Sequence, residues 1–380
     1  MSKPNNHSIW FWQRILTPHM ATLAAALAER GFAVTFVANT LLSENRSKLG
    51  WEIPKLGKVI FKLAENKDAV TRLALEAPDN SIHLCQGLRS NGLVSNAQRV
   101  LRKRSLKHWA LMEMVDDFGW LGLLKKALYR IIFLHWRSHL EGVLAIGRNA
   151  PTWFIARGME KNRIYPFAYF LKKPQTNQLL QSSDEVSTKR PFRFIFVGRL
   201  IKLKKVDHLI NAIAALKIKE VEVWIIGNGP EEKYLRSLAN SLLPTQVRWI
   251  GTLPISKVPN MISQTDCLVL PSRYDGWGAV VSEALMVGTP VICSDACGSS
   301  AAVQASGVGS VFSTNDQQAL TNVLQKQIIV GHWHHNQRQQ VAQWATCLSA
   351  DSGAEYLDLI LNNNHKDSID VPWLKKNNLY

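Results

Sequence analysis

The sequence predicts an α/β protein built from two domains, each with a parallel sheet covered by helices. At 380 residues the chain exceeds the size that one hydrophobic core usually serves, so two domains are expected. Strand-like apolar runs alternate with helix-like patterns along the whole length, which is typical of parallel sheets. The expected boundaries are residues 1–167 for the N-terminal domain, 168–191 for a linker, 192–350 for the C-terminal domain and 351–380 for a partly loose C-terminal segment.

The first half opens with a strand–helix–strand unit. Residues 8–12 are predicted as a strand, 20–30 as a helix that Gly31 stops, and 33–38 as the next strand. Further strands are expected at 81–85, 109–115, 142–146 and 163–165.

The second half repeats the alternation from residue 192, after a polar stretch rich in Gln, Ser, Lys and Pro. A strand at 192–197 is followed by a helix at 204–216 and a strand at 221–226. Further strands are expected at 247–250, 267–270, 290–293 and 309–312, and residues 316–361 are predicted as helical with interruptions.

The five cysteines show no metal-ligand clustering. They are Cys85, Cys267, Cys293, Cys297 and Cys347, and no second pair or nearby histidine completes a zinc set. Structural disulfides are not expected, which favours a reducing, cytosolic compartment. The first residues lack the basic and apolar regions of a signal peptide, and no stretch approaches the ~20 apolar residues that span a bilayer.

The net charge of +16 is unevenly placed. Residues 1–170 carry 24 Lys and Arg against 12 Asp and Glu, whereas residues 171–380 carry 21 against 17. Basic surfaces favour anionic membranes, nucleic acid or acidic substrates. Nothing in the sequence resembles a nucleic-acid module, so anionic lipid headgroups are the expected partner of the basic N-terminal half.

The segment from Pro271 to Ile292 carries the clearest chemical signal. It holds two carboxylates, Asp275 and Glu283, eight positions apart, with a loop bracketed by Gly276 and Gly278 between them. Two glycines let the backbone approach a ligand, and a helix start offers free N–H groups to an anion. Ionised carboxylates only accept hydrogen bonds, which suits hydroxyl recognition. The pattern predicts a site for a ligand with both phosphate and sugar groups.

A second signal lies after the strand at 192–197. The strand ends at Gly198 and delivers Arg199, and Lys204 then begins a helix. Two cations at the carboxyl end of a parallel strand can hold a diphosphate, because Arg binds it bidentately and Lys supplies a point charge. Taken alone, this motif is also consistent with a solvated basic helix start.

Both segments resemble the signature of the retaining glycosyltransferases of family four, which have the two-domain GT-B fold. That family carries two acids separated by seven residues, followed by an Ala-(Leu/Met)-x-x-Gly-x-Pro-Val-Ile run, and a Gly-Arg-Leu-x-x-x-Lys motif. The sequence departs from the family at Asp275, where Glu is usual, at Lys205, where Gly is usual, and at residues 13–20, which lack a Gly-Gly pair. The resemblance implies two Rossmann-like domains that face each other across a cleft.

The resemblance also implies roles for single residues on the donor side. Glu283 would accept hydrogen bonds from the ribose, Asp275 would contact the donor sugar, and Arg199 and Lys204 would stabilise the leaving diphosphate. The remaining donor contacts would come from the backbone of Gly198, Gly227, Gly229, Leu253, Gly276, Trp277, Gly278 and Ala279. No Asp-x-Asp motif is present, so neither a metal nor any other cofactor is expected beside the nucleotide-sugar co-substrate, for which a UDP-sugar is the first candidate.

The acceptor side is less defined. His19 lies near a helix start, where it could face the cleft or remain a surface or capping residue. The family often has a cleft histidine near residues 82–89, and the best register puts Gln86 close to that point and His83 on the strand, where a core role is equally consistent. Glu113 follows a strand and could face the acceptor or the solvent.

Two segments of the N-terminal half could contact a membrane. One is a basic patch of Arg99, Arg102, Lys103, Arg104 and Lys107 on an expected helix. The other is residues 120–136, which combine aromatic and aliphatic residues with Lys125, Lys126 and Arg130. Interfacial helices have this composition, and so do basic helices packed on a sheet.

The sequence thus predicts a cytoplasmic transferase, peripheral on the inner face of the cytoplasmic membrane, that moves a hexose from a nucleotide donor to a glycan or lipid-linked acceptor in bacterial surface polysaccharide or lipopolysaccharide synthesis. One alternative is a sugar-nucleotide epimerase of the same architecture, which needs no acceptor. Another is a phosphorylase of the same architecture, which needs inorganic phosphate. A third alternative is a non-catalytic partner that has kept the nucleotide site.

Overall fold

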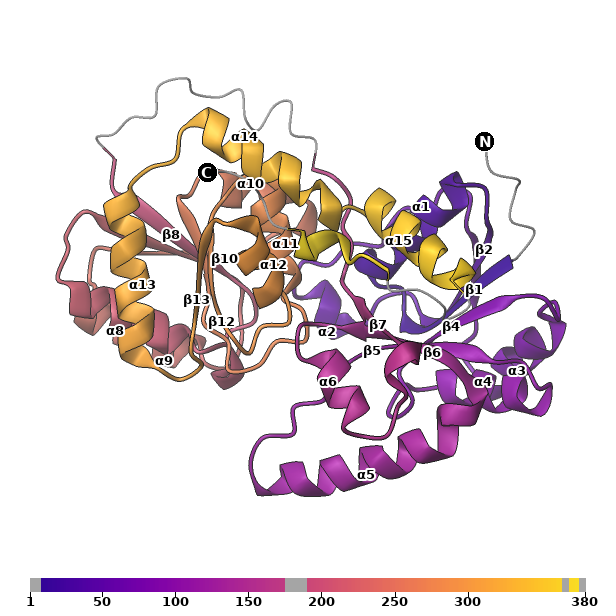
Figure 1. The fold of residues 1–380 in the computed structure, drawn as a ribbon. Coiled ribbons are helices and arrows are strands. Elements are labelled where there is room, and N and C mark those ends of the chain that lie inside the picture. The colour runs from indigo at the N-terminus through magenta and orange to yellow at the C-terminus, as the bar shows by residue number, and fades with distance from the viewer. Residues whose placement is uncertain (1–7, 175–189, 364–368, 376–380) are drawn as a thin grey trace. The chain divides into compact units, whose positions relative to one another are not determined.

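A computed structural model describes residues 8–174, 190–363 and 369–375. Within them the chain divides into two compact units (Figure 1). Unit 1 combines residues 8–44, 53–172 and 350–371, and unit 2 combines residues 45–52, 173–349 and those after 371. Neither unit is contiguous in sequence, which differs from the expected boundaries.

Unit 1 contains a seven-stranded parallel sheet with the order β3-β2-β1-β4-β5-β6-β7. The strands are β1 (Ser8–Ile15), β2 (Ala33–Thr40), β3 (Ile60–Leu63), β4 (Ile82–Gln86), β5 (His108–Glu113), β6 (Leu140–Ile146) and β7 (Ile164–Phe167). The central strands read as nearly continuous apolar runs because helices bury both faces of a parallel sheet. Of the strands in the described part of unit 1, only β3 was not predicted; it is a four-residue edge strand whose Ile60 and Leu63 are exposed.

The helices of unit 1 are α1 (Pro18–Glu29), α3 (Lys67–Glu76), α4 (Val94–Lys103), α5 (Trp120–Trp136), α6 (Ala150–Ile155) and α15 (Ala350–Asn362), while α2 (Glu44–Ser47) leads into unit 2. The hydroxyl of Thr17 caps α1 by accepting a hydrogen bond from the Met20 N–H, and Pro18 at the first turn lacks the N–H that would go unpaired there. Gly31, with φ of +94°, follows the helix end.

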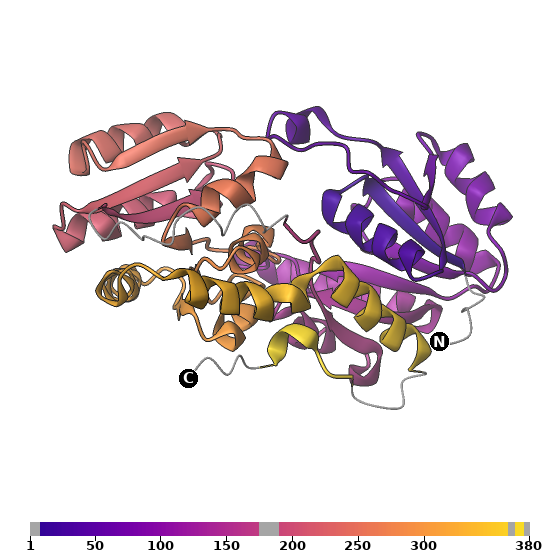
Figure 2. The ribbon, with the colours of Figure 1, turned by 90° about the horizontal axis from the view of Figure 1, so that it is seen from above.

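The C-terminal helix α15 packs in unit 1, although the sequence predicts residues 351–380 as a separate segment. It lies alongside α1 (Figure 1 and Figure 2) and buries Ala354, Tyr356 and Leu357. A Cβ on Gly353 would lie 2.2 Å from the Phe170 ring, so this contact needs glycine. Phe170, within the expected linker, is therefore a core residue of unit 1. Of that linker, residues 175–189 lie outside the described residues.

Unit 2 contains a six-stranded parallel sheet with the order β10-β9-β8-β11-β12-β13. Its strands are β8 (Phe192–Val197), β9 (Val221–Ile226), β10 (Val247–Gly251), β11 (Cys267–Leu270), β12 (Val291–Ser294) and β13 (Gly309–Phe312). Its helices are α8 (Val206–Leu216), α9 (Glu232–Leu242), α10 (Val258–Ser263), α11 (Ala279–Met286), α12 (Ser300–Ser306), α13 (Gln317–Val330) and α14 (His335–Trp344). Every strand expected in this half is present.

None of the five cysteines forms a disulfide, as the sequence predicts. Across the described ranges, no helix is both long and apolar enough to cross a membrane. The same residues contain no group of three or more His, Cys, Asp or Glu side chains that could hold a metal ion.

Two buried histidines lie in the core of unit 1. His83 on β4 accepts a hydrogen bond from the Trp12 indole N–H at its Nδ1, at 3.2 Å, and its Nε2 lies 3.1 Å from the hydroxyl of Ser81. Burial, with a contribution from Arg104, lowers the pKa of His83 to about 4. Burial also lowers the pKa of His108 to about 3, helped by the neighbouring imidazoles. Both rings are therefore neutral in the folded protein at pH 7.

We expect unit 1 to lose stability on mild acidification. Below pH 6.5 the histidines bind protons in the unfolded chain but remain neutral in the folded protein. The folded state is therefore most stabilised above pH 6.5, and this stabilisation is lost as the pH falls towards 4. For His83 alone the whole shift corresponds to about 3 kcal/mol, of which about 2 kcal/mol is lost between pH 7 and pH 5. Denaturant unfolding at pH 7 and pH 5 measures the loss. The His83→Gln variant cannot take up this proton and should show a smaller pH dependence; an unchanged slope would contradict the assignment.

Candidate active site

The residues predicted for the donor side follow four neighbouring strands of unit 2. Gly198 and Arg199 follow β8, the turn from Gly227 to Gly229 follows β9, Leu253 follows β10, and the segment with Asp275 follows β11. These strands are parallel and adjacent in the sheet, so all four loops meet at its carboxyl edge. The structure thus brings together residues that are up to 85 positions apart in the sequence.

Lys204 and Asp275 form an ion pair between the loops after β8 and β11. The pairing follows from the backbone, because the Arg273 N–H donates to the Leu203 carbonyl at 2.9 Å and so joins the two loops. Both side chains are mostly shielded from solvent, which strengthens their attraction. The cation is therefore held at the edge of the sheet by a carboxylate that the sequence already predicts as part of the site.

Arg199 is exposed, and its guanidinium has no ion pair or hydrogen bond with the residues that the structure describes. Its main chain is fixed, because the neighbouring Gly198 N–H donates to the Ile226 carbonyl at 3.0 Å and the Leu200 N–H donates to the Asn228 carbonyl at 2.8 Å. A free guanidinium on a rigid loop can bind an anion bidentately without first breaking a protein contact.

Glu283 on α11 is half-buried, and within the described part of the chain its carboxyl has no ion-pair or hydrogen-bond partner. Burial raises the pKa of Glu283 to about 7. A carboxyl group that is shielded from water and lacks a partner is free to accept hydrogen bonds from a ligand once it is ionised.

The loop before α11 exposes backbone groups rather than side chains. Among the residues that the structure describes, no side chain caps α11, so its first N–H groups stay open to a ligand. Gly278 has φ of +83°, and a Cβ there would lie 2.9 Å from Leu270. The Trp277 indole is buried, donates to the Ser282 hydroxyl at 3.0 Å and packs against Trp373. Trp277 can therefore contribute to a ligand contact only through its main chain.

The glycines of the turn after β9 have a packing role. A Cβ on Gly227 would lie 1.9 Å from the Gly198 carbonyl oxygen, and one on Gly229 would lie 2.3 Å from that of Leu200. Only glycine allows the two loops to approach this closely. These residues shape the backbone that presents Arg199, whether or not their amides also contact a ligand.

A segment of the N-terminal half belongs to unit 2, which the sequence does not predict. Residues 45–52 pack against the loop after β10, where the Ile255 N–H donates to the Gly50 carbonyl at 2.9 Å. Gly50, with φ of +77°, meets the Leu253 carbonyl so closely that a Cβ would lie 1.9 Å away. Asn228 extends the contact by donating to the carbonyl of Lys48. The carbonyl of Leu253 is therefore covered by this segment.

Lys205 adopts the left-handed conformation, with φ of 53° and ψ of 39°, just before α8. This conformation strains a residue with a Cβ by about 1–2 kcal/mol. Glycine, the residue usual in the resembling family, would avoid the strain, so the departure at Lys205 preserves the backbone geometry of the loop at a cost in stability.

Three of the four predicted acceptor-side residues lie at the carboxyl edge of the sheet in unit 1. His19 stacks on the Tyr169 ring with 5.1 Å between ring centroids, and the Tyr169 hydroxyl donates to Glu113 at 2.7 Å. Gln86, at the end of β4, accepts from the Arg14 N–H at 2.8 Å and so fixes the loop after β1. Tyr169 was not predicted, because it falls within the expected linker. Its one signal in the sequence is that an aromatic residue follows an expected strand.

The assignment of His83 to the acceptor side is corrected by the structure. The imidazole is fully buried, and both ring nitrogens contact Trp12 and Ser81. The core alternative is therefore the right one for this residue, and no acceptor can reach it.

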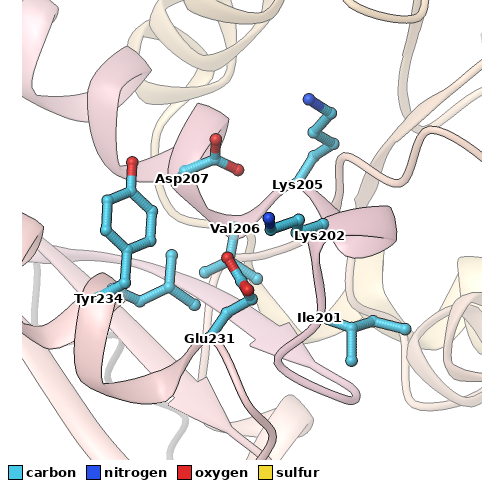
Figure 3. A pocket seen from close by; sticks show the side chains of 8 residues that line it. Ile201, Lys202, Lys205, Val206, Asp207, Glu231 and Tyr234 are labelled. Atoms are coloured by element: carbon cyan, nitrogen blue, oxygen red, sulfur yellow. The ribbon is translucent and has the colours of Figure 1, made fainter.

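A cavity of about 450 Å³ lies beside the candidate site, between the start of α8 and α9. Figure 3 shows Lys202, Lys205, Asp207 and Glu231 around it, together with Tyr234. Charges of both signs line the cavity, and none of the predicted donor residues does. It is thus separate from the surface formed by Arg199, Lys204, Asp275 and Glu283.

The residues that form this surface fall within a recognised sequence family. Residues 179–343 match the family model described as glycosyl transferases group 1. These residues belong to that family. An uncharacterized 41.2 kDa protein in the cps region of Klebsiella pneumoniae is 21% identical to this chain over 192 residues, which are 50% of this chain and 52% of that protein. The chain spans about half the length, or less, of the curated relatives it matches.

Solved structures resemble the chain outside the group 1 domain as well. Anabaena HepE in complex with UDP and glucose has a TM-score of 0.71 at 14% identity, covering 94% of this chain and 100% of that one. The lipopolysaccharide outer core galactosyltransferase WaaB has a TM-score of 0.69 at 15% identity, covering 94% and 99%. Likeness at this level of identity concerns the fold. It confirms the α/β class, the two Rossmann-like domains and the GT-B architecture.

Proposed function

We propose that the chain is a retaining glycosyltransferase that moves a hexose from a nucleotide-diphosphate donor to a glycan or lipid-linked acceptor. The observation that carries the proposal is the meeting of Arg199 and the Lys204–Asp275 pair beside the uncapped start of α11. Fixed positive charge and open N–H groups at one sheet edge suit a diphosphate leaving group, and a neighbouring carboxylate suits a sugar. The match to the group 1 family supports the same chemistry.

In the proposed reaction, Arg199 and Lys204 stabilise the negative charge that grows on the diphosphate as the bond to the sugar breaks. Asp275 orients Lys204 and contacts the donor sugar, while Glu283 accepts hydrogen bonds from the ribose. The proposal assigns the neutralising charge to the two cations and includes no divalent ion or other cofactor. A UDP-sugar is the first donor to test, because the similar HepE structure contains UDP and glucose.

We further propose a role in bacterial surface polysaccharide or lipopolysaccharide synthesis, with the enzyme acting in the cytoplasm at the membrane. WaaB, with a similar fold, is named as a lipopolysaccharide galactosyltransferase. The basic N-terminal half suits an acceptor carried by anionic lipid. His19, Tyr169 and Glu113 in unit 1 would then lie on the acceptor side.

The decisive experiment measures nucleotide-diphosphate release from a panel of sugar nucleotides, with and without a bacterial lipid extract and with and without EDTA. Release from one donor that rises with the extract and resists EDTA supports the transferase. Conversion of the donor sugar without an acceptor would indicate an epimerase, and dependence on inorganic phosphate a phosphorylase. Binding of the free diphosphate without release from any donor, even with extracts from several bacteria, would favour the non-catalytic alternative.

The pKa of Glu283 predicts the pH dependence of catalysis. Only the ionised carboxylate can accept hydrogen bonds from two ribose hydroxyls, so kcat/KM should rise as the pH passes through about 7 and level off above it. The Glu283→Gln variant should be less active and should lack this rise. If kcat/KM of this variant still rose as the pH passed through about 7, another group would be responsible for the pH dependence.

A further inference from the structure

Helix α5 (Trp120–Trp136) presents an unusual surface on the outside of unit 1 (Figure 1). We infer that this helix docks the protein onto an anionic lipid bilayer, lying in the plane of the interface with its outward face inserted among the lipids. The inference concerns a surface of unit 1 and does not depend on the sugar chemistry proposed for unit 2.

One face of α5 anchors the helix firmly to unit 1. Tyr129 and Phe133 are buried in a core cluster with Trp153 and Phe154. At its start, a Cβ on Gly122 would lie 1.8 Å from the Asp117 carbonyl oxygen, so the helix approaches the preceding loop as closely as glycine permits. That loop is fixed in turn, because Asp117 accepts hydrogen bonds from the side chains of Trp153 and Arg157. The helix is thus a fixed part of unit 1.

The opposite face of α5 is apolar and uncovered. Trp120, Leu124, Ile131 and Leu134 follow one another at helical spacing, and their exposed fractions are 76%, 63%, 65% and 46%. Leu123 and Phe118 flank this stripe and are also exposed, at 68% and 76%. A water-facing helix normally carries polar residues on this side, and a continuous exposed apolar stripe marks an interaction site.

The charges around the stripe identify its partner. Residues 119–139 include no Asp or Glu, whereas Lys126 and Arg130 are exposed beside the stripe. At the other end of the helix, Arg102 of α4 donates to the His135 ring at 2.6 Å and adds a further cation. A second copy packed through α5 would bring these cations together without any acidic partner, which is unfavourable. Anionic lipid headgroups complement the same pattern.

The geometry fits an interfacial position. Seventeen residues make a helix about 25 Å long, and Lys125, Lys126 and Arg130 interrupt its apolar character, so it suits the plane of the bilayer rather than a crossing. Six residues separate Trp120 from Glu113 at the carboxyl edge of the sheet. Docking through α5 would therefore hold the Glu113–Tyr169–His19 cluster close to lipid headgroups.

The test is sedimentation of the full chain with vesicles of phosphatidylglycerol and phosphatidylcholine, compared with phosphatidylcholine alone. We expect binding to the anionic vesicles that weakens with salt. The Leu124→Glu/Ile131→Glu variant should bind at least about tenfold more weakly, because it replaces the centre of the stripe by charges that anionic lipids repel. The Lys126→Ala/Arg130→Ala variant should bind anionic vesicles more weakly and lose most of the salt dependence.

The matched control is Ile329→Glu/Val330→Glu on α13 of unit 2, where two equally exposed apolar residues receive the same charges. This variant should bind like the unchanged chain, and all variants should keep its melting temperature, because the substituted side chains are exposed. Equal binding by the α5 and α13 variants would overturn the inference. So would binding to neither vesicle, or a dimer in solution that the Leu124→Glu/Ile131→Glu variant converts to a monomer.

Discussion

Replacing Arg199 by Ala is expected to lower kcat/KM for nucleotide-diphosphate release by about 10²- to 10³-fold. Lys204 is paired with Asp275, whereas the guanidinium of Arg199 is exposed at the carboxyl end of β8 and, among the described residues, has no ion-pair partner. Its loss leaves the growing charge on the diphosphate without a bidentate partner. Steady-state kinetics with the donor that the panel identifies measure the effect, and Kd for the free diphosphate shows how much of it is ground-state binding.

The controls separate this effect from damage to the fold. Arg199 is exposed and its side chain makes no hydrogen bond or ion pair within the described residues, so the melting temperature of the variant should stay within the small range of a surface substitution. The Arg199→Lys variant keeps the positive charge but loses the planar guanidinium. Its kcat/KM should therefore lie between those of the unchanged chain and of the Arg199→Ala variant. Lys326→Ala removes an exposed cation from α13 and should change nothing. An Arg199→Ala variant within twofold of the unchanged chain would remove Arg199 from the proposed mechanism.

The fold was largely predictable because a parallel sheet leaves a strong pattern in the sequence. Strands buried on both faces are continuous apolar runs, and the helices between them have clear ends, such as the Pro18 start and Gly31 stop of α1. β3 was missed because its side chains are mostly exposed, so no apolar run marks it. The packing of α15 on unit 1 was also missed, since a local pattern does not reveal which sheet a helix covers.

The meeting of the candidate donor-side residues at one sheet edge could be predicted for the same physical reason. Arg199, Lys204 and Asp275 each follow a buried strand, and parallel strands bring such positions to one edge. The acceptor side depended on which face of a strand or helix each residue occupies. His83 lies on the same strand as Gln86, β4, yet its side chain is buried in the core whereas Gln86 ends the strand at the edge of the sheet. Tyr169 could not be predicted, because its contact with Glu113 joins residues 56 positions apart that no motif connects.

For α5, too, the local pattern of the sequence left open where the side chains lie. The sequence showed an amphipathic, basic helix that could cover a sheet or lie on a membrane. The structure shows that only a narrow face around Tyr129 and Phe133 packs, which leaves the stripe from Trp120 to Leu134 exposed. Phe133 itself, which falls on the charged side of the helical pattern, proves to be a core residue. Side-chain exposure therefore supports the docking inferred for α5, which composition alone does not separate from packing on a sheet.

The Gly227→Ala substitution is expected to lower the free energy of unfolding by about 3 kcal/mol, because the added Cβ would lie 1.9 Å from the Gly198 carbonyl oxygen. The backbone cannot move away easily, since the Gly198 N–H donates to Ile226 and the Gly227 N–H donates to the Gly251 carbonyl at 2.8 Å. The φ of +133° is also unfavourable for alanine. Thermal unfolding should show a midpoint about 6–12 °C lower.

The control is Gly31→Ala, just after α1, where φ is +94° and nothing lies within 4 Å of an added Cβ. It carries the conformational strain without the collision and should cost only about 1 kcal/mol. If both variants lost the same stability, the close approach of the loops after β8 and β9 would not be the cause. The folded fraction of the Gly227→Ala protein can also be tested for binding of the diphosphate. Weaker binding would show that the contact between Gly227 and Gly198 positions Arg199, because Arg199 lies in the same loop as Gly198.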